Sequence, residues 1–320
     1  MPRQRRSFSG KTAFSIAIGI VLMVLIDQAL FKDWSPVPPE TKQTPPAVES
    51  TIVIEQPEAS HKPDFAPPRE IEIAEPVLSP EDPVWIKNAV PSNAPEEAPK
   101  IVIIIDDMGM DRKHTREAMD LPAPLTLAFL PYAGDLERQT QYGRERGHEL
   151  MVHVPMEPVD GGQDSGPAVL KPDIPPEEFG SILNDALGRF DGYVGINNHM
   201  GSKMTQDRPG MALVMTELKK RGLLFVDSRT ISTSVAEDEA RKAGIPHAGR
   251  DVFLDHEDTY EFVEGALEQL EKKALKDGIA IGIGHPKEET INALKAWIPT
   301  LKDKGIYLVP VSAVVSVPGE

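Results

Sequence analysis

The sequence predicts an α/β fold of parallel strands joined by helices over residues 99–320. Short apolar runs alternate there with segments whose apolar residues recur at helical spacing, and acidic residues or histidines follow most of the runs. The preceding residues differ in composition, since about half of the 31 prolines lie between Pro36 and Pro99. Strands and helices in alternation predict either a (β/α) barrel or an open doubly wound sheet.

Residues 1–31 have the pattern of an N-terminal signal anchor. Several arginines precede an apolar run over 14–26, and apolar residues continue to Phe31 beyond Asp27. Counted to Phe31, the run approaches the ~20 residues that a membrane-spanning helix needs. No A-x-A cleavage site follows it, which favours a retained anchor over a removed signal peptide. By the positive-inside rule we expect a single-pass protein of the inner (cytoplasmic) membrane, with the remainder in the periplasm or outside the cell.

Residues 32–98 are rich in Pro, Glu, Ala and Ser and keep neither the strand period nor the helix period over a useful length. This composition is typical of a disordered, extended tether. The catalytic domain is therefore expected to occupy 99–320.

The charge and the lack of cysteine exclude several function classes. A formal net charge of -16 disfavours nucleic acid as a partner, because phosphate backbones are bound by clustered Lys and Arg. It is compatible with a neutral or cationic glycan. With no cysteine, the chain has no disulfides, thiolate metal sites or cysteine nucleophiles.

Eight apolar runs are predicted to form the strands of the domain, and amphipathic segments, clearest over 179–190 and 262–274, are predicted to form helices between them. In chain order, the predicted strands cover 101–105, 125–130, 150–154, 193–196, 223–226, 252–254, 279–283 and 306–309.

Polar side chains occur where six of these strands end. In a parallel α/β fold the carboxyl ends of the strands share one face, and that face carries the active site. A lone Asp or His after a strand is more often a cap or loop residue, yet caps alone would not require histidine at three strand ends. The residues are Asp106 and Asp107, then His153, then Asn197, Asn198 and His199, then Asp227, then Asp255, and finally His285; His256, which follows Asp255, is left undecided between a site and a loop residue.

One Asp and two His residues form a suitable ligand set for a divalent metal such as zinc, with one position left open for water. Asp106, next to the ligand candidate Asp107, could act as the base that takes a proton from that water. His285, from a later strand, could protonate the leaving group. The set predicts metal-assisted hydrolysis of an amide or ester.

Three short segments in this order resemble the divergent branch of the polysaccharide deacetylase superfamily, whose members have a NodB-type domain. They are IIDDMG at 104–109, HVPMEP at 153–158 and NNHMGS at 197–202, with GHP at 284–286 closing the pattern. The resemblance covers about residues 100–315. It implies a deformed (β/α) barrel of seven to eight parallel strands and removal of N-acetyl groups from an acetylated glycan of the envelope or extracellular space.

The resemblance also implies roles for single residues. Asp106 would be the base, Asp107 and His153 metal ligands, and His285 the acid. The third ligand departs from the main family, which has a second histidine where this chain has Glu157. His199 is favoured as that ligand because Glu157 is flanked by prolines, and Glu157 would then support a ligand by hydrogen bonding.

Four further residues are site candidates. Asn197 and Asn198 could donate hydrogen bonds to the sugar or the developing oxyanion, although Asn also favours turns. Asp227 could orient the catalytic histidine, and Arg229 could pair with Asp106 and lower its pKa.

Two functions from different classes fit the sequence. The first is a metal-dependent deacetylase acting on C–N bonds. The second is a catalytically weak or inactive glycan-binding or scaffolding protein of the envelope. Bound metal together with acetate release would separate them. A change of substrate to an amide or ester in peptidoglycan or in a lipid-linked sugar would keep the same chemistry.

Overall fold

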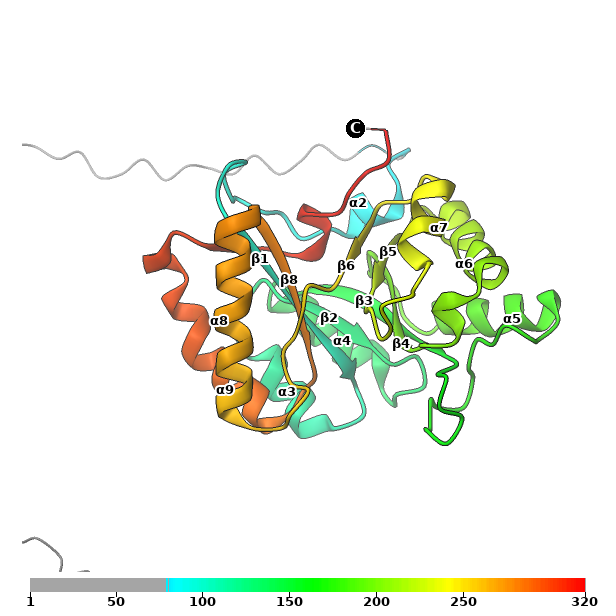
Figure 1. Cartoon of the computed structure of the whole chain (residues 1–320), viewed down its shortest axis with the longest axis horizontal. Coiled ribbons are helices and arrows are strands. Elements are labelled where there is room, and N and C mark those ends of the chain that lie inside the picture. The colour runs from blue at the N-terminus through cyan, green and yellow to red at the C-terminus, as the bar shows by residue number, and fades with distance from the viewer. Residues whose placement is uncertain (1–78, 80, 320) are drawn as a thin grey trace, which may run out of the picture. The chain divides into compact units, whose positions relative to one another are not determined.

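A computed structural model of the chain describes residue 79 and residues 81–319 (Figure 1). The predicted anchor over 1–31 and most of the predicted tether lie outside the described residues. Within the described part of the chain, no helix is both long enough and apolar enough to cross a membrane.

The core of the domain is a curled half-barrel of eight parallel strands, in the order β6-β5-β4-β3-β2-β1-β8-β7 (Figure 1). A ninth short strand, β9, pairs with β1 beside this path. The strands are β1 Lys100–Met108, β2 Thr126–Phe129, β3 Glu149–Met156, β4 Gly195–Met200, β5 Leu224–Asp227, β6 His247–Gly249, β7 Val252–Phe253, β8 Ile279–Gly284 and β9 Tyr307–Leu308.

This order is that of a barrel and not of a doubly wound sheet. Strands β1 to β6 follow one another without a reversal, and β8 returns to pair with β1 from Lys100↔Ile279 to Ile105↔Gly284. Only Arg250 and Asp251 separate β6 from β7 in the chain, and no ladder joins these two strands in the described structure. The half-barrel is therefore open along that seam, and the predicted deformed barrel is confirmed.

Alternate residues of the strands face opposite sides of the curled sheet. In β1, Val102 and Ile104 belong to an inner cluster together with Ile281 of β8. Ile103 and Ile105 belong to a second cluster, which includes the apolar faces of the helices. Each fully buried aliphatic side chain contributes about 1.5–3 kcal/mol, so the near-continuous apolar runs of the parallel strands account for much of the fold's stability.

The helices cover the outer side of the sheet, with α8 and α9 at one flank in Figure 1 and α5, α6 and α7 at the other. Side chains at the first cap position start three of them: Asp111 accepts from the backbone of α3, Asp207 from α6 and Thr259 from α8. Their bounds are α3 Arg112–Met119, α4 Leu136–Glu145, α5 Pro176–Leu187, α6 Arg208–Arg221, α7 Ala236–Ala243, α8 Tyr260–Asp277 and α9 Glu288–Trp297, with short 3-10 helices at Met204–Gln206, Ile298–Thr300, Lys302–Lys304 and Val311–Ala313.

Residues 81–98 correct the predicted boundary of the tether. They were expected to be disordered, yet they form the short helix α2 Val84–Asn88 and pack on the amino ends of the strands. The Trp85 backbone N–H donates to Gly222 O at 2.9 Å, and Asn88 Nδ2 donates to Tyr193 O at 2.8 Å. Trp85 packs against the inner cluster. The ordered domain thus begins near residue 81.

A buried carboxylate binds both ends of the described chain at the amino ends of the strands, which form the floor of the barrel. Glu149, at the start of β3, is fully buried and accepts hydrogen bonds from Val90 N at 3.2 Å, from Ser312 N at 3.0 Å and from Ser312 Oγ. Burial raises the pKa of Glu149, and these hydrogen bonds oppose the rise. The carboxylate holds the residues after α2 against the C-terminal segment.

Candidate metal centre and active site

An irregularity in β1 brings two neighbouring aspartates to the carboxyl-end face of the barrel. The register of β1 against β2 shifts between Ile105 and Met108, and Asp107 has a φ of 55°. A bulge re-aims side chains that would otherwise alternate, and a positive φ costs a non-glycine residue about 1 kcal/mol or more. The local strain directs Asp107 into the same space that Asp106 faces.

Asp107, His153 and His199 bring three ligand atoms together. Asp107 Oδ1 lies 2.8 Å from His199 Nδ1 and 3.3 Å from His153 Nε2, and the two ring nitrogens lie 3.2 Å apart. Ligand atoms at 2.0–2.1 Å from a tetrahedral ion lie about 3.3 Å from one another. These three ligand atoms of Asp107, His153 and His199, called the ligand triangle below, are therefore spaced like one face of a tetrahedral site. They form the one such group of three among the described residues.

Hydrogen bonds fix which nitrogen of His153 faces this triangle. Asn197 Nδ2 donates to Asp106 Oδ1 at 2.7 Å, so the carbonyl oxygen of Asn197 faces His153 Nδ1 at 2.8 Å and accepts its proton. His153 Nε2 is then left with its lone pair toward the triangle. Asp107 Oδ1 is buried and faces both ring nitrogens. An oxygen and two ring nitrogens that converge in this way fit a divalent cation.

The electrostatics of the two aspartates differ. Burial alone would raise the pKa of Asp107, but His153 and His199 outweigh it and hold that pKa well below its usual range. Asp106 is only 3% exposed, and burial raises its pKa although the charges of His153 and His285 oppose the rise. Asp107 is thus suited to stay an anionic ligand, and Asp106 holds a proton to higher pH than an ordinary aspartate does.

His285 is held by Asp255 and faces the ligand triangle. Its Nδ1 donates to Asp255 Oδ1 at 2.9 Å, its backbone N–H donates to Asp255 Oδ2 at 2.7 Å, and its Nε2 lies 3.9 Å from Asp107 Oδ2. Thr290 Oγ1 also donates to Asp255. Burial would lower the pKa of His285, but Asp255 outweighs it and raises that pKa. The result is an imidazole that keeps its proton to higher pH.

The predicted roles of Asp227 and Arg229 are wrong. Asp227 accepts from Ser234 Oγ at 2.6 Å and from the backbone of Arg229 at 2.7 Å, which closes the loop after β5. Arg229 pairs with Glu237 at 2.7 Å and not with Asp106. Because β5 lies far from β8 in the strand order, Asp227 cannot take the orienting role that Asp255 has beside β8.

The predicted substrate contacts of Asn197 and Asn198 also need correction. Asn197 is fully buried and uses its amide on Asp106 and His153. Asn198 accepts from Ser228 N at 2.9 Å and donates to Met200 O at 2.7 Å. Both amides therefore position site residues or the loop after β4.

Glu157 stands apart from the ligand triangle. Its Oε2 pairs with Lys203 Nζ at 2.8 Å, which links the loops after β3 and β4. The structure thus groups His199 with Asp107 and His153, as the sequence favoured. Glu157 forms an ion pair with Lys203 and is not part of this group of candidate ligands.

Two residues near the site were not selected from the sequence. In the sequence Asp255 is one of several acids that follow strands, and its position directly after the sixth predicted strand is the signal that could have found it. Arg250 donates to Ser228 O at 2.6 Å and to Arg229 O at 2.7 Å, and its guanidinium lies 4.9 Å from the centre of the Phe253 ring. No sequence signal pointed to Arg250, because β6 itself was not predicted.

Comparison with known proteins agrees with this fold. A protein of Haemophilus influenzae, described only as uncharacterized, is 33% identical over 210 residues, which are 64% of this chain and 72% of that protein. The uncharacterized protein YibQ of Escherichia coli is 31% identical over 226 residues, which are 71% of this chain and 70% of YibQ. The crystal structure of the uncharacterized protein ATU2773 of Agrobacterium tumefaciens superposes with a TM-score of 0.70 at 29% identity, covering 72% of this chain and 94% of that one.

Residues 103–315 match the family model described as divergent polysaccharide deacetylase. The match contains both aspartates of the β1 bulge, all three residues of the ligand triangle and the His285–Asp255 pair. The chain belongs to the divergent polysaccharide deacetylase family.

Proposed function

We propose that this protein is a metal-dependent hydrolase that removes N-acetyl groups from an acetylated amino sugar of an envelope or extracellular glycan. The observation that carries the proposal is the convergence of Asp107 Oδ1, His153 Nε2 and His199 Nδ1, three ligand atoms that lie 2.8–3.3 Å from one another. These three residues would hold the divalent ion, for which zinc suits the N and O donor set. Family membership supports the deacetylase chemistry.

The residues around the triangle have separate roles in this proposal. A bound divalent ion would polarise the amide carbonyl and lower the pKa of a water molecule. Asp106, whose pKa burial raises, accepts the proton of the attacking water. His285, kept protonated by Asp255, donates a proton to the leaving nitrogen. Asn197 holds Asp106 and His153 in register with each other.

We also propose that the protein acts from the inner membrane. The basic residues and the apolar run within 1–31 support a single-pass anchor, with the catalytic domain in the periplasm or outside the cell. Protease added to spheroplasts should digest the domain, and protection of the domain until the membrane is lysed would contradict this orientation.

The test is metal content and acetate release by the full chain in detergent. Wild type should hold near one metal ion per chain and release acetate from N-acetylglucosamine oligomers or peptidoglycan. His199→Ala should lose the metal, and Glu157→Ala is its matched control that keeps it. Asp106→Asn should keep the metal and lose turnover. A His153→Ala variant with full metal occupancy would overturn the ligand set. Metal without acetate release from any acetylated glycan would favour the glycan-binding role.

A further inference from the structure

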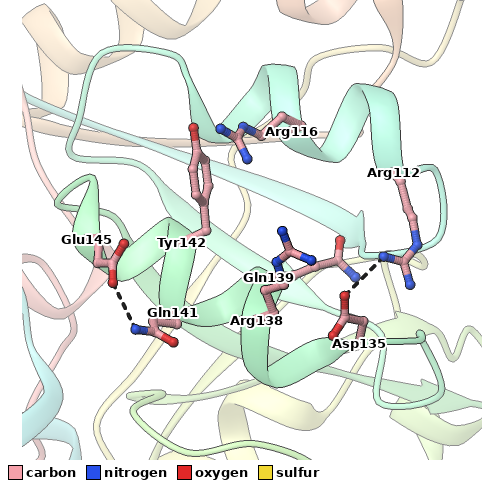
Figure 2. A pocket seen from close by; sticks show the side chains of 8 residues that line it. All are labelled: Arg112, Arg116, Asp135, Arg138, Gln139, Gln141, Tyr142 and Glu145. Atoms are coloured by element: carbon pink, nitrogen blue, oxygen red, sulfur yellow. Dashed lines mark hydrogen bonds and ion pairs between the residues drawn. The ribbon is translucent and has the colours of Figure 1, made fainter.

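A hollow of about 470 Å³ lies between α3 and α4, apart from the ligand triangle (Figure 2). Arg116 from α3 and Arg138 from α4 both line it, and Figure 2 shows their side chains directed into the space between the two helices. Its other lining residues are Arg112, Asp135, Gln139, Gln141, Tyr142 and Glu145.

Tyr142, which lines this hollow, stacks with two arginines, of which Arg116 also lines the hollow and Arg146 does not. The Tyr142 ring lies between two guanidinium groups, with Arg116 at 3.4 Å and Arg146 at 3.6 Å from the ring centre. Asp120 accepts from the Tyr142 hydroxyl at 2.5 Å and from Arg146 Nε at 2.6 Å, and it lies 3.4 Å from Arg116 Nε. A single carboxylate thus faces two guanidinium groups, and the stack restricts their motion.

The rest of the lining leaves one cation uncompensated. Arg112 pairs with Asp135 at 3.2 Å, and Glu145 accepts from Gln141 at 2.9 Å. Arg138 is exposed and has no hydrogen bond or ion pair with any of the described residues. The hollow therefore combines an unpaired guanidinium with the free N–H groups of Arg116, in a chain whose formal net charge is -16.

We propose that this hollow binds a phosphate group. Guanidinium groups from two helices approach the hollow from different directions, which suits the tetrahedral oxygens of phosphate better than a planar carboxylate. The group also needs more than one negative charge or several acceptor oxygens, because Asp120, Asp135 and Glu145 already offset part of the positive charge. Gln139, which lines the hollow, donates to Gly109 O at 3.3 Å, and Gly109 follows Asp107 by two residues in the chain. The proposal does not depend on the deacetylase activity.

The test is calorimetric titration of the full chain in detergent with inorganic phosphate at low salt. Metal is first removed with 1,10-phenanthroline, an uncharged chelator, so that phosphate cannot bind a metal ion instead. Wild type should bind with a Kd on the order of 1 mM, and binding should weaken as salt rises. Arg138→Ala and Arg116→Ala should each weaken it by about fivefold or more.

The matched control is Arg241→Ala on α7. Arg241 pairs with Asp238 and is 59% exposed, close to the 55% of Arg116, and its removal should leave the Kd for phosphate unchanged. Equal loss of binding in all three variants, binding of succinate as tight as that of phosphate, or no binding by wild type would overturn the proposal. Two further probes separate the sources of the group: tighter binding of glucose 1-phosphate supports a phosphate on a glycan, and tighter binding of dihexanoyl-phosphatidylglycerol supports a lipid headgroup.

Discussion

Asn197 offers the sharpest test of the proposed metal centre, because it touches the metal site without being a ligand. Asn197→Ala removes the acceptor of the His153 Nδ1 proton at 2.8 Å and the donor to Asp106 at 2.7 Å. Loss of such an outer hydrogen bond typically weakens metal binding 10–100-fold, or about 1.4–2.8 kcal/mol. Two buried groups would also lose their partner, so we expect the free energy of unfolding to fall by about 3 kcal/mol.

Asn197→Asp is the matched variant. The introduced carboxylate can still accept from His153, so zinc affinity should stay within about threefold of wild type. In this variant an oxygen of the new carboxylate would lie about as far from Asp106 Oδ1 as Asn197 Nδ2 does now, at 2.7 Å. Like charges at that distance raise the pKa of the pair, so the acidic limb of the rate profile should move to higher pH. Zinc Kd by chelator competition and pH–rate profiles measure both effects. Unchanged zinc affinity in Asn197→Ala would refute the reasoning.

Three further predictions concern protonation and the floor of the barrel. Burial would lower the pKa of His153, but Asp106 and Asp107 outweigh it and raise that pKa. A proton on His153 competes with the metal ion. Below the pKa of His153, the zinc affinity should therefore fall about tenfold per pH unit in a titration from pH 8 to 5. Asp255→Asn removes the main group that raises the pKa of His285, so the alkaline limb of the rate profile should move to lower pH, and an unmoved limb would contradict the assignment of the acid. A fragment that starts at residue 99 lacks α2 and its hydrogen bonds to Gly222 and Tyr193. In urea denaturation it should be about 2–4 kcal/mol less stable than a fragment that starts at residue 79. Equal midpoints of the two fragments would mean that residues 81–98 do not stabilise the domain.

The sequence predicted the strands well because parallel strands are apolar on both faces, whereas the choice of a barrel over a doubly wound sheet came from the family resemblance. Each of the eight predicted runs overlaps an observed strand. The three-residue β6, His247–Gly249, was missed because a His-Ala-Gly segment has no apolar run. Residues 84–88 were missed because the helix-forming Trp85 and Ile86 lie among prolines and acids, where composition outweighs two apolar side chains.

The sequence predicted the residues whose position depends only on their place at a strand end. It did not predict contacts that depend on which strands are neighbours in the sheet. Strand ends meet on one face in any parallel barrel, so the ligand triangle could be expected from its residue types. The partner of His285 depends on which strand lies next to β8, and that strand is β7, which brings Asp255, and not β5, which carries Asp227. The amides of Asn197 and Asn198 were assigned to substrate because a sequence does not show that both are buried.

The attachment of α2 has a mechanical consequence. Tension that reaches the described chain near residue 81 is taken up first by the bonds from Trp85 to Gly222 and from Asn88 to Tyr193. Those two acceptors precede β5 and β4, so the force enters the barrel at the amino ends of its strands, while the ligand triangle lies at their carboxyl ends. A pull along the chain would therefore strain the floor and leave the spacing of Asp107, His153 and His199 undisturbed.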